Sequence, residues 1–307
     1  TSTARACTCS SGTAADGFIG AFIMAHLVLV FFRSHGNPGI RRLYPWRFTA
    51  VPLLLFLAML GSVWVRVTAA VIAVFWDVYH SSLQTFGIGR IYDRNTGNDP
   101  EQGRSLDILL NHFLYIGPLL GGAMLMHHAG AFYEYYEVGS VFFTEIPSAI
   151  EARRPALRSA ALWSALPFAA LYLAAYRRIL RRGYRPPPQK LALFLATGLT
   201  SLWTWGFNSF GMALFIMNFF HAFQYFVLVW AYERDNVIRV FRLDAAARGP
   251  AIALALFVLL PFVYGAAGGI LADKNDAVLS ATLVVSLMHF WYDGFIWSVR
   301  AKDGTRC

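Results

Sequence analysis

Residues 76–93 read W-D-V-Y-H-S-S-L-Q-T-F-G-I-G-R-I-Y-D, and this stretch decides how the rest of the chain is interpreted. It continues an apolar run that begins after Arg66, so the two form a segment long enough to cross a bilayer. Asp77, His80 and Gln84 lie in this segment, and at helical spacing they fall within about 60° of one another. Because ionisable groups at membrane depth are costly and rarely face lipid, this stripe indicates a partner inside the protein.

The composition agrees with a membrane protein. Of the 307 residues, 57% are hydrophobic, 16% are aromatic and 14% are charged, and the mean hydropathy is +0.49. These values predict an all-α polytopic transmembrane helical bundle that forms one integral-membrane domain over 1–307, with a flexible N-terminal segment 1–15. The sequence has no phosphate-binding loop, zinc knuckle or basic-aromatic surface, so we expect no nucleic-acid partner despite the net charge of +9.

The apolar runs predict about nine membrane spans. The second and third, and likewise the sixth and seventh, are so close together that seven or eight spans are also possible. We expect the first run to be retained as a span, because no basic residue closely precedes it and no cleavage site follows it. The predicted ranges are 17–33, 48–65, 67–90, 106–132, 156–176, 190–207, 209–232, 250–271 and 278–299.

Nine spans also predict an orientation. The loops that alternate between the two sides then hold 20 and 6 of the 26 Lys and Arg residues. Because basic residues accumulate on the cytoplasmic side, this asymmetry predicts an N-terminus outside and a C-terminus in the cytoplasm. We expect an integral protein of the bacterial inner (cytoplasmic) membrane.

Seven of the eight histidines fall within predicted spans. Five come from five different spans at compatible depth, with the first three in the cytoplasmic half and the other two near the middle. Imidazole is the commonest metal ligand, and several from facing helices suit iron, zinc or copper. The five predicted metal ligands are His26, His80, His112, His221 and His289.

Carboxylates follow these histidines at helical spacing. Asp77 lies three residues before His80, and Asp293 lies four after His289, so either could bind metal or orient an imidazole. Alternatively, each histidine only makes a hydrogen bond between helices. His127 and His128 lie nearer the outer face and could form a second site or face the surface.

Four segments resemble a known family. A-H-L at residues 25–27, Y-H-S-S-L-Q at 79–84, F-F-H-A-F-Q-Y-F at 219–226 and M-H-F-W-Y-D at 288–293 are similar, in order and spacing, to the histidine segments of the Brp/Blh-type bacterial β-carotene 15,15′-dioxygenases. That family is a polytopic helical bundle in which transmembrane histidines are thought to hold non-haem iron for cleavage of a carotenoid by O₂.

The resemblance implies roles for particular residues. His26, His80 and His221 would be iron ligands, and His289 with Asp293 would match the last histidine-aspartate segment. The chain departs from the family at Tyr225, where the family carries a second histidine. His112 or His289 would then take the place of that ligand, and the substrate could differ from a carotenoid.

Together these observations predict a membrane-embedded non-haem iron oxygenase with one or two ions, O₂, and a lipophilic substrate such as a carotenoid or acyl chain. Asp77, Tyr225 and Asp293 are its candidate catalytic residues, and Tyr79 and Tyr292 could help to line its cavity. Two alternatives stay open. One is a haem b or quinone-linked redox subunit, because two histidines suffice as axial ligands. The other is a non-catalytic subunit of a larger membrane complex.

Overall fold

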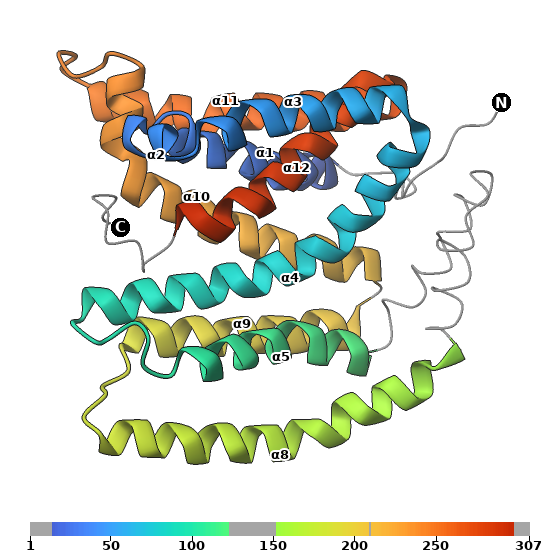
Figure 1. Cartoon of the computed structure of the whole chain (residues 1–307), viewed down its shortest axis with the longest axis vertical. Helices are drawn as coiled ribbons and strands as arrows, with labels where there is room; N and C mark the ends of the chain where they lie inside the picture. Colours follow the sequence, from blue (N-terminus) through green and yellow to red (C-terminus); the bar gives the residue numbers. More distant parts are fainter. Residues whose placement is uncertain (1–13, 123–151, 209, 298–307) are drawn as a thin grey trace. The chain divides into compact units, whose positions relative to one another are not determined.

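The computed structural model describes residues 14–122, 152–208 and 210–297. Within these ranges the regular elements are all helices, and no strand occurs. They are α1 (Ala14–Ser34), α2 (Pro38–Leu43), α3 (Pro45–Gly61), α4 (Val63–Asn95), α5 (Arg104–Gly122), α8 (Arg154–Arg181), α9 (Pro188–Phe207), α10 (Phe210–Val240), α11 (Gly249–Leu271) and α12 (Asp276–Ile296), with a single 3₁₀ turn at Ala272–Lys274 (Figure 1).

The prediction of an all-helical fold is confirmed, and the apolar helices agree with a membrane protein. Each of the nine predicted spans overlaps a helix, although residues 123–132 and 298–299 of two of them lie outside the described residues. Six helices are long and apolar enough to cross a membrane: α1, α4, α8, α10, α11 and α12. The other three fall below that criterion, since α3 has 17 residues and α5 and α9 carry polar side chains along their length. Nine spans and the orientation therefore stay predictions.

Local sequence signals explain where several helices begin and end. The Asn37 side chain accepts hydrogen bonds from two backbone N–H groups of α2, a short helix that hydropathy did not predict. Asn275 caps α12 in the same way. Extended backbone at Ser62 separates α3 from α4, so the second and third predicted spans fall on two helices, but the break lies at Ser62 and not at Arg66, which is inside α4.

The chain divides into two compact units. We call Cys7–Trp76 with Asn218–Cys307 the terminal unit, and Asp77–Met217 with Thr1–Ala6 the middle unit. The boundaries after Trp76 and after Met217 fall inside continuous helices, α4 and α10. The single integral-membrane domain stays a prediction.

In the terminal unit, α1 packs against α11 and α12, and α12 also packs against α3. The closest approach lies at Gly265 of α11. A Cβ atom there would collide with the Ala21 carbonyl and lie 2.9 Å from the Ala25 backbone nitrogen. Small residues therefore let α1 and α11 meet backbone to backbone, which is how helices commonly associate in membranes.

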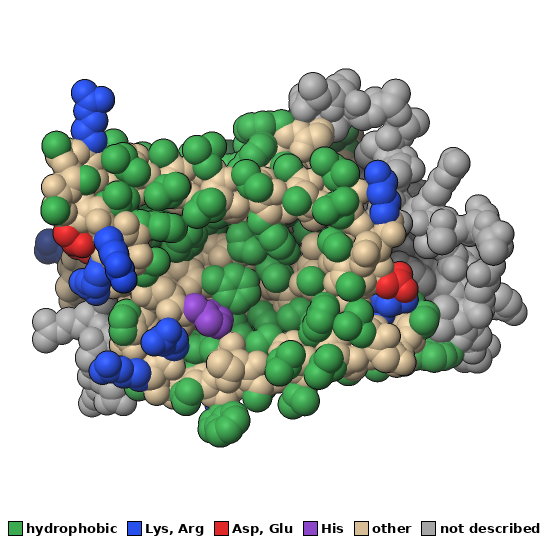
Figure 2. Space-filling view, turned by 90° about the horizontal axis from the view of Figure 1, so that it is seen from above, with side chains coloured by type: hydrophobic (Ala, Val, Ile, Leu, Met, Phe, Trp, Pro, Cys, Tyr) green, Lys and Arg blue, Asp and Glu red, His purple; other side chains and the backbone are tan. Residues whose placement is uncertain are grey.

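The exposed surface of the terminal unit is largely apolar. Figure 2 shows a face on which hydrophobic side chains predominate, while Lys, Arg, Asp and Glu side chains lie toward the ends of that face. The exposed apolar residues of the terminal unit include Leu54 and Leu57 of α3 and Leu259 and Val263 of α11. Such a surface suits contact with lipid rather than water.

In the middle unit, α5 packs against both α8 and α9 (Figure 1). Its apolar core contains Tyr115, Leu119 and Trp205. Next to these apolar residues the unit buries charged and hydroxyl-bearing side chains, which α4, α5 and α9 contribute.

Candidate metal centre

Three of the five predicted ligands meet in the terminal unit. His26 of α1, His221 of α10 and His289 of α12 are each at most 1% exposed. One ring nitrogen from each can be chosen so that the three lie within 4.8 Å of one another. The ring centre of His26 lies 5.1 Å from that of His221 and 5.0 Å from that of His289. An ion among three such nitrogens would have three imidazole ligands from three helices.

Contacts of α1 with α10 and α11 fix the rotation of α1 about its axis. Phe22, one turn before His26, stacks on Phe226 of α10 with ring centres 4.7 Å apart. Ala25, which is fully buried, places α1 against Gly265 of α11. The rotation of α1 that turns His26 inward is thus set by apolar contacts and by backbone contact, which leave little freedom to the helix.

His26 has the hydrogen bond that a metal ligand needs. Its Nδ1 bonds to the backbone carbonyl of Ile23. Because a carbonyl oxygen only accepts, Nδ1 carries the proton, and in the neutral ring Nε2 keeps its lone pair. Nε2 is buried and has no hydrogen-bond partner among the described residues. A backbone carbonyl that orients an imidazole in this way is typical of protein metal sites.

Asp293 and Tyr225, two of the three predicted catalytic residues, lie beside this group. The Tyr225 hydroxyl donates to Asp293 Oδ1 at 2.7 Å, and the Trp297 indole N–H donates to the same oxygen at 3.0 Å. The other carboxylate oxygen, Oδ2, lies 3.9 Å from His289 Nε2. The Tyr225 and His289 ring centres are 4.6 Å apart. The carboxylate is thus held toward His289 by two donors.

A buried ion pair that sequence reasoning missed lies at the end of the same helices. Arg33 of α1 pairs with Glu233 of α10, donates through Nε to the Ile296 carbonyl at 3.1 Å, and lies 4.0 Å above the Trp297 ring. Asn236 also donates to Glu233, at 2.6 Å. In the sequence, Arg33 counts as a loop charge. The one feature of the sequence that could have indicated its burial is the seven-residue spacing from His26, which places both residues on one face of α1.

Asp77, His80 and His112 belong to the middle unit. His112 Nδ1 lies 2.7 Å from the Ser82 hydroxyl, and its ring stacks on Tyr79 at 5.2 Å. This is the hydrogen bond between helices that we considered as the alternative role. His80 is buried and Asp77 is half-buried on α4. Their roles as ligands or catalytic groups, and that of His112 as a ligand, stay predictions.

Two further predicted groups can be placed. Tyr292 donates its hydroxyl to the Arg47 carbonyl at 3.0 Å, which ties α12 to α3. Its role as a cavity-lining residue stays a prediction, as does that of Tyr79. His127 and His128 lie outside the described residues.

His35, the one histidine predicted in a loop, is held separately from the metal candidates. Its Nε2 donates to the Phe48 carbonyl at 3.0 Å. Burial, with a smaller contribution from the nearby Arg41 charge, lowers the pKa of His35 below its ordinary value. It is therefore a half-buried, neutral imidazole with a structural hydrogen bond, and it offers a control for the three clustered histidines.

We compared the chain with known protein families, curated proteins and solved structures. No family model matches the chain, and neither a curated protein nor a solved structure matches it significantly. The site must therefore be judged on its own geometry.

Proposed function

We propose that this chain is a membrane-embedded oxygenase in which His26, His221 and His289 hold non-haem iron and the substrate is lipophilic. The observation that supports this most is the convergence of three buried imidazoles from three helices within 4.8 Å. Burying three imidazoles among apolar helices is costly, and one ion bound by all three would offset that cost.

Each residue has a distinct task in this proposal. Three neutral imidazoles leave positions on the metal open, where iron would supply the chemistry of O₂. Ile23 fixes the tautomer of His26 through its carbonyl. Asp293, held by Tyr225 and Trp297, orients His289 and can hold a proton next to the site. The apolar helix surfaces exclude water and admit a carotenoid or an acyl chain from the bilayer.

The geometry favours non-haem iron over haem b. Two imidazoles could bind a haem iron from opposite faces, with the macrocycle extending between them. Here three imidazoles lie within 4.8 Å of one another, one more than a haem iron would need. A redox or quinone-linked subunit that binds haem b is the alternative, and a Soret band in the purified protein would reveal it.

Elemental analysis of the purified protein tests the proposal directly. We expect stoichiometric iron in the wild type, and loss of most of it in His26→Ala and His221→Ala. His35→Gln is the matched control, because it removes a half-buried imidazole of the same unit while an amide can still donate to the Phe48 carbonyl. It should retain the metal.

Three results would contradict the proposal in different ways. Zinc or copper instead of iron would keep the site and change its chemistry. Absence of stoichiometric metal from monodisperse wild type would favour a non-catalytic subunit of a larger complex. Undiminished metal in both alanine variants would remove these residues from the ligand set.

The oxygenase step has its own test. Iron-loaded protein in detergent or nanodiscs should consume O₂ when given β-carotene or an unsaturated acyl lipid, with cleaved or oxygenated product detected by mass spectrometry. Consumption with one substrate class and not with the other would identify the chemistry. If the protein binds metal but consumes O₂ with neither substrate class, the metal site would stand and the oxygenase reaction would be ruled out for these substrates.

We further propose that the chain lies in the bacterial inner membrane with its C-terminus in the cytoplasm.

A further inference from the structure

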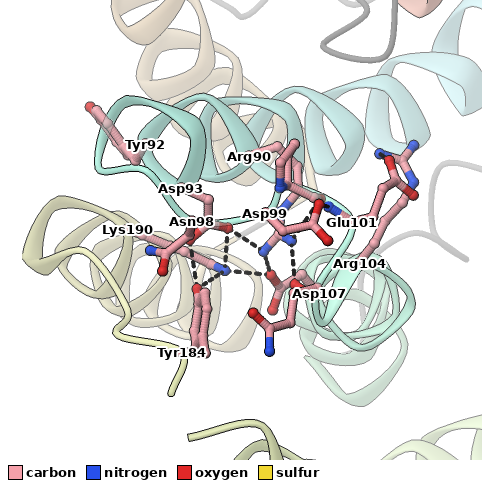
Figure 3. Close-up of polar contacts among 12 residues, drawn as sticks. Arg90, Tyr92, Asp93, Asn98, Asp99, Glu101, Arg104, Asp107, Tyr184 and Lys190 are labelled. Carbon is pink, nitrogen blue, oxygen red and sulfur yellow. Dashed lines mark hydrogen bonds and ion pairs between the residues drawn. The ribbon is translucent and has the colours of Figure 1, made fainter. Parts of the chain in front are cut away.

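A second group of buried charges lies in the middle unit. Arg90 and Asp93 of α4, Asp107 of α5 and Lys190 of α9 form what we call the charged cluster, shown in Figure 3. Lys190 Nζ lies 2.8 Å from Asp93 Oδ2 and 2.6 Å from Asp107 Oδ2. Arg90 pairs with both carboxylates. Three helices thus meet at four ionised side chains with a formal sum of zero.

Tyrosines complete the charged cluster. Tyr184 donates to Asp93 at 2.6 Å, and Tyr176 donates to Asp107 at 2.6 Å. Burial and the hydrogen bond to Asp93 raise the pKa of Tyr184 above its ordinary value, so this phenol stays protonated and keeps donating. Because the charges balance and the carboxylates are surrounded by donors, the cluster needs neither an additional metal cation nor an anion.

A line of buried hydroxyls continues from Lys190 along α9. Thr197, Ser201 and Thr204 are all 0% exposed and follow Lys190 on one helix face, over about 21 Å at 1.5 Å per residue. None of the three hydroxyls has a hydrogen-bond partner among the described residues. On α5, Asn111 is equally buried and its Oδ1 is also without a partner there. We call these four residues the polar seam.

The absence of partners along the polar seam is not the usual behaviour of helical hydroxyls, which often bond to a carbonyl of the preceding turn. Other hydroxyls of this chain do so. Ser280 donates to the Asp276 carbonyl at 2.7 Å, and Thr85 donates to the Ser81 carbonyl at 3.2 Å. The hydroxyls of α9 do not make this bond, and no described side chain or backbone group replaces it.

The polar seam is connected to the charged cluster. Asn111 lies one turn after Asp107 and donates to the Asp107 backbone carbonyl at 2.8 Å. At the same end of α9, Phe194 and Lys190 pack against Gly89 of α4, while Gly198 packs against Leu114 of α5. The face that carries the hydroxyls is therefore buried in the unit, where α9 packs on α5 and its charged end also contacts α4, and it begins at a group of titratable side chains.

Water is the partner that fits such a seam. Buried polar atoms without protein partners are normally satisfied by ordered water, whereas an ion would require charge that hydroxyls and an amide do not supply. We propose that the polar seam holds a file of water molecules and conducts protons to and from the charged cluster. Each oxygen in the file accepts a proton on one side and releases one on the other, so no covalent bond is changed overall.

Proton flux in liposomes tests this proposal. Purified protein is reconstituted into vesicles loaded with K⁺ and a pH-sensitive dye, and valinomycin then sets a membrane potential. We expect wild type to admit protons faster than protein-free vesicles do. The double variant Thr197→Val with Ser201→Ala should return the flux to the protein-free level, because it removes two adjacent hydroxyls with little change of shape. Thr200→Val, on the same helix outside the buried stripe, is the matched control and should conduct like wild type.

The same variants supply a second measurement, their thermal stability in detergent. Removing hydroxyls that bond to water should leave the stability unchanged or lower it, whereas removing dry, unsatisfied hydroxyls should raise it. Wild-type flux no faster than in empty vesicles would overturn the proposal. A double variant that is more stable and conducts like wild type would overturn it as well. The metal content of these variants should equal that of wild type, so this outcome is independent of the terminal-unit site.

Discussion

At the scale of single residues, the terminal-unit site depends on how each imidazole is oriented. His26 obtains its orientation from the Ile23 carbonyl on its own helix. Near His289 the structure instead provides a carboxylate, whose Oδ1 already accepts two hydrogen bonds and whose Oδ2 lies 3.9 Å from the ring. Asp293 is therefore better described as a positioning residue than as one that must touch substrate.

This role predicts the effect of Asp293→Asn. The amide oxygen can keep the bonds from Tyr225 and Trp297, but the carboxylate charge beside His289 is lost. We expect metal affinity to fall by about 10- to 100-fold, as is usual when an outer partner of a metal ligand is removed. Competition with a chelator of known affinity measures this. Tyr225→Phe, which removes one of the two donors, should have a smaller effect, and equal affinity in Asp293→Asn and wild type would rule out the positioning role.

At the scale of helices, the position of His26 depends on the contact between α1 and α11. Gly265 permits that contact, because any Cβ there would meet backbone atoms of Ala21 and Ala25 rather than a movable side chain. The adjacent turn of α11 offers a comparison, since a Cβ at Gly269 would meet nothing within 4 Å. The two glycines differ in packing while they share one helix.

We therefore expect Gly265→Ala to separate α1 from α11 and to displace His26. Overpacking of this kind costs about 1–3 kcal/mol, so the variant should unfold at a lower temperature and bind metal more weakly. Gly269→Ala should match wild type in both measurements, made by thermal unfolding in detergent and by metal analysis. If the two variants behave alike, the close approach at Gly265 does not position the site.

At the scale of the whole molecule, the distribution of charge predicts the orientation. Three basic residues of the richer side, Arg33, Arg90 and Lys190, are buried and paired with carboxylates, so they report less on topology than loop charges do. Leaving them out gives 17 basic residues on that side against 6 on the other. The asymmetry persists without them.

We expect the C-terminus to be cytoplasmic for this reason. A reporter that is active only in the cytoplasm, fused after residue 307, should be active in a bacterial host, and a reporter that needs the opposite compartment should be inactive there. The reverse result would mean that the number of spans differs from nine by an odd number, or that the loops lie on the opposite sides of the membrane from those assigned.

Much of the fold could be predicted from the sequence, because helix formation in a membrane is a local property. A run of apolar residues must satisfy its own backbone hydrogen bonds, so the ranges predicted from hydropathy each overlap a helix in the described part of the chain. The short helix α2 was missed because its signal is a cap at Asn37 rather than an apolar run. Histidine within apolar runs was likewise visible as an anomaly, which is why His26, His221 and His289 were candidates.

Only the tertiary structure decided which of these candidates meet. The grouping of His26 with His221 and His289 depends on how α1, α10 and α12 are rotated about their axes, and distant contacts such as the one at Gly265 set that rotation. The charged cluster was hidden for the same reason. Asp93 and Lys190 read as loop charges, and they become a buried pair because α9, far away in the sequence, packs beside the consecutive helices α4 and α5.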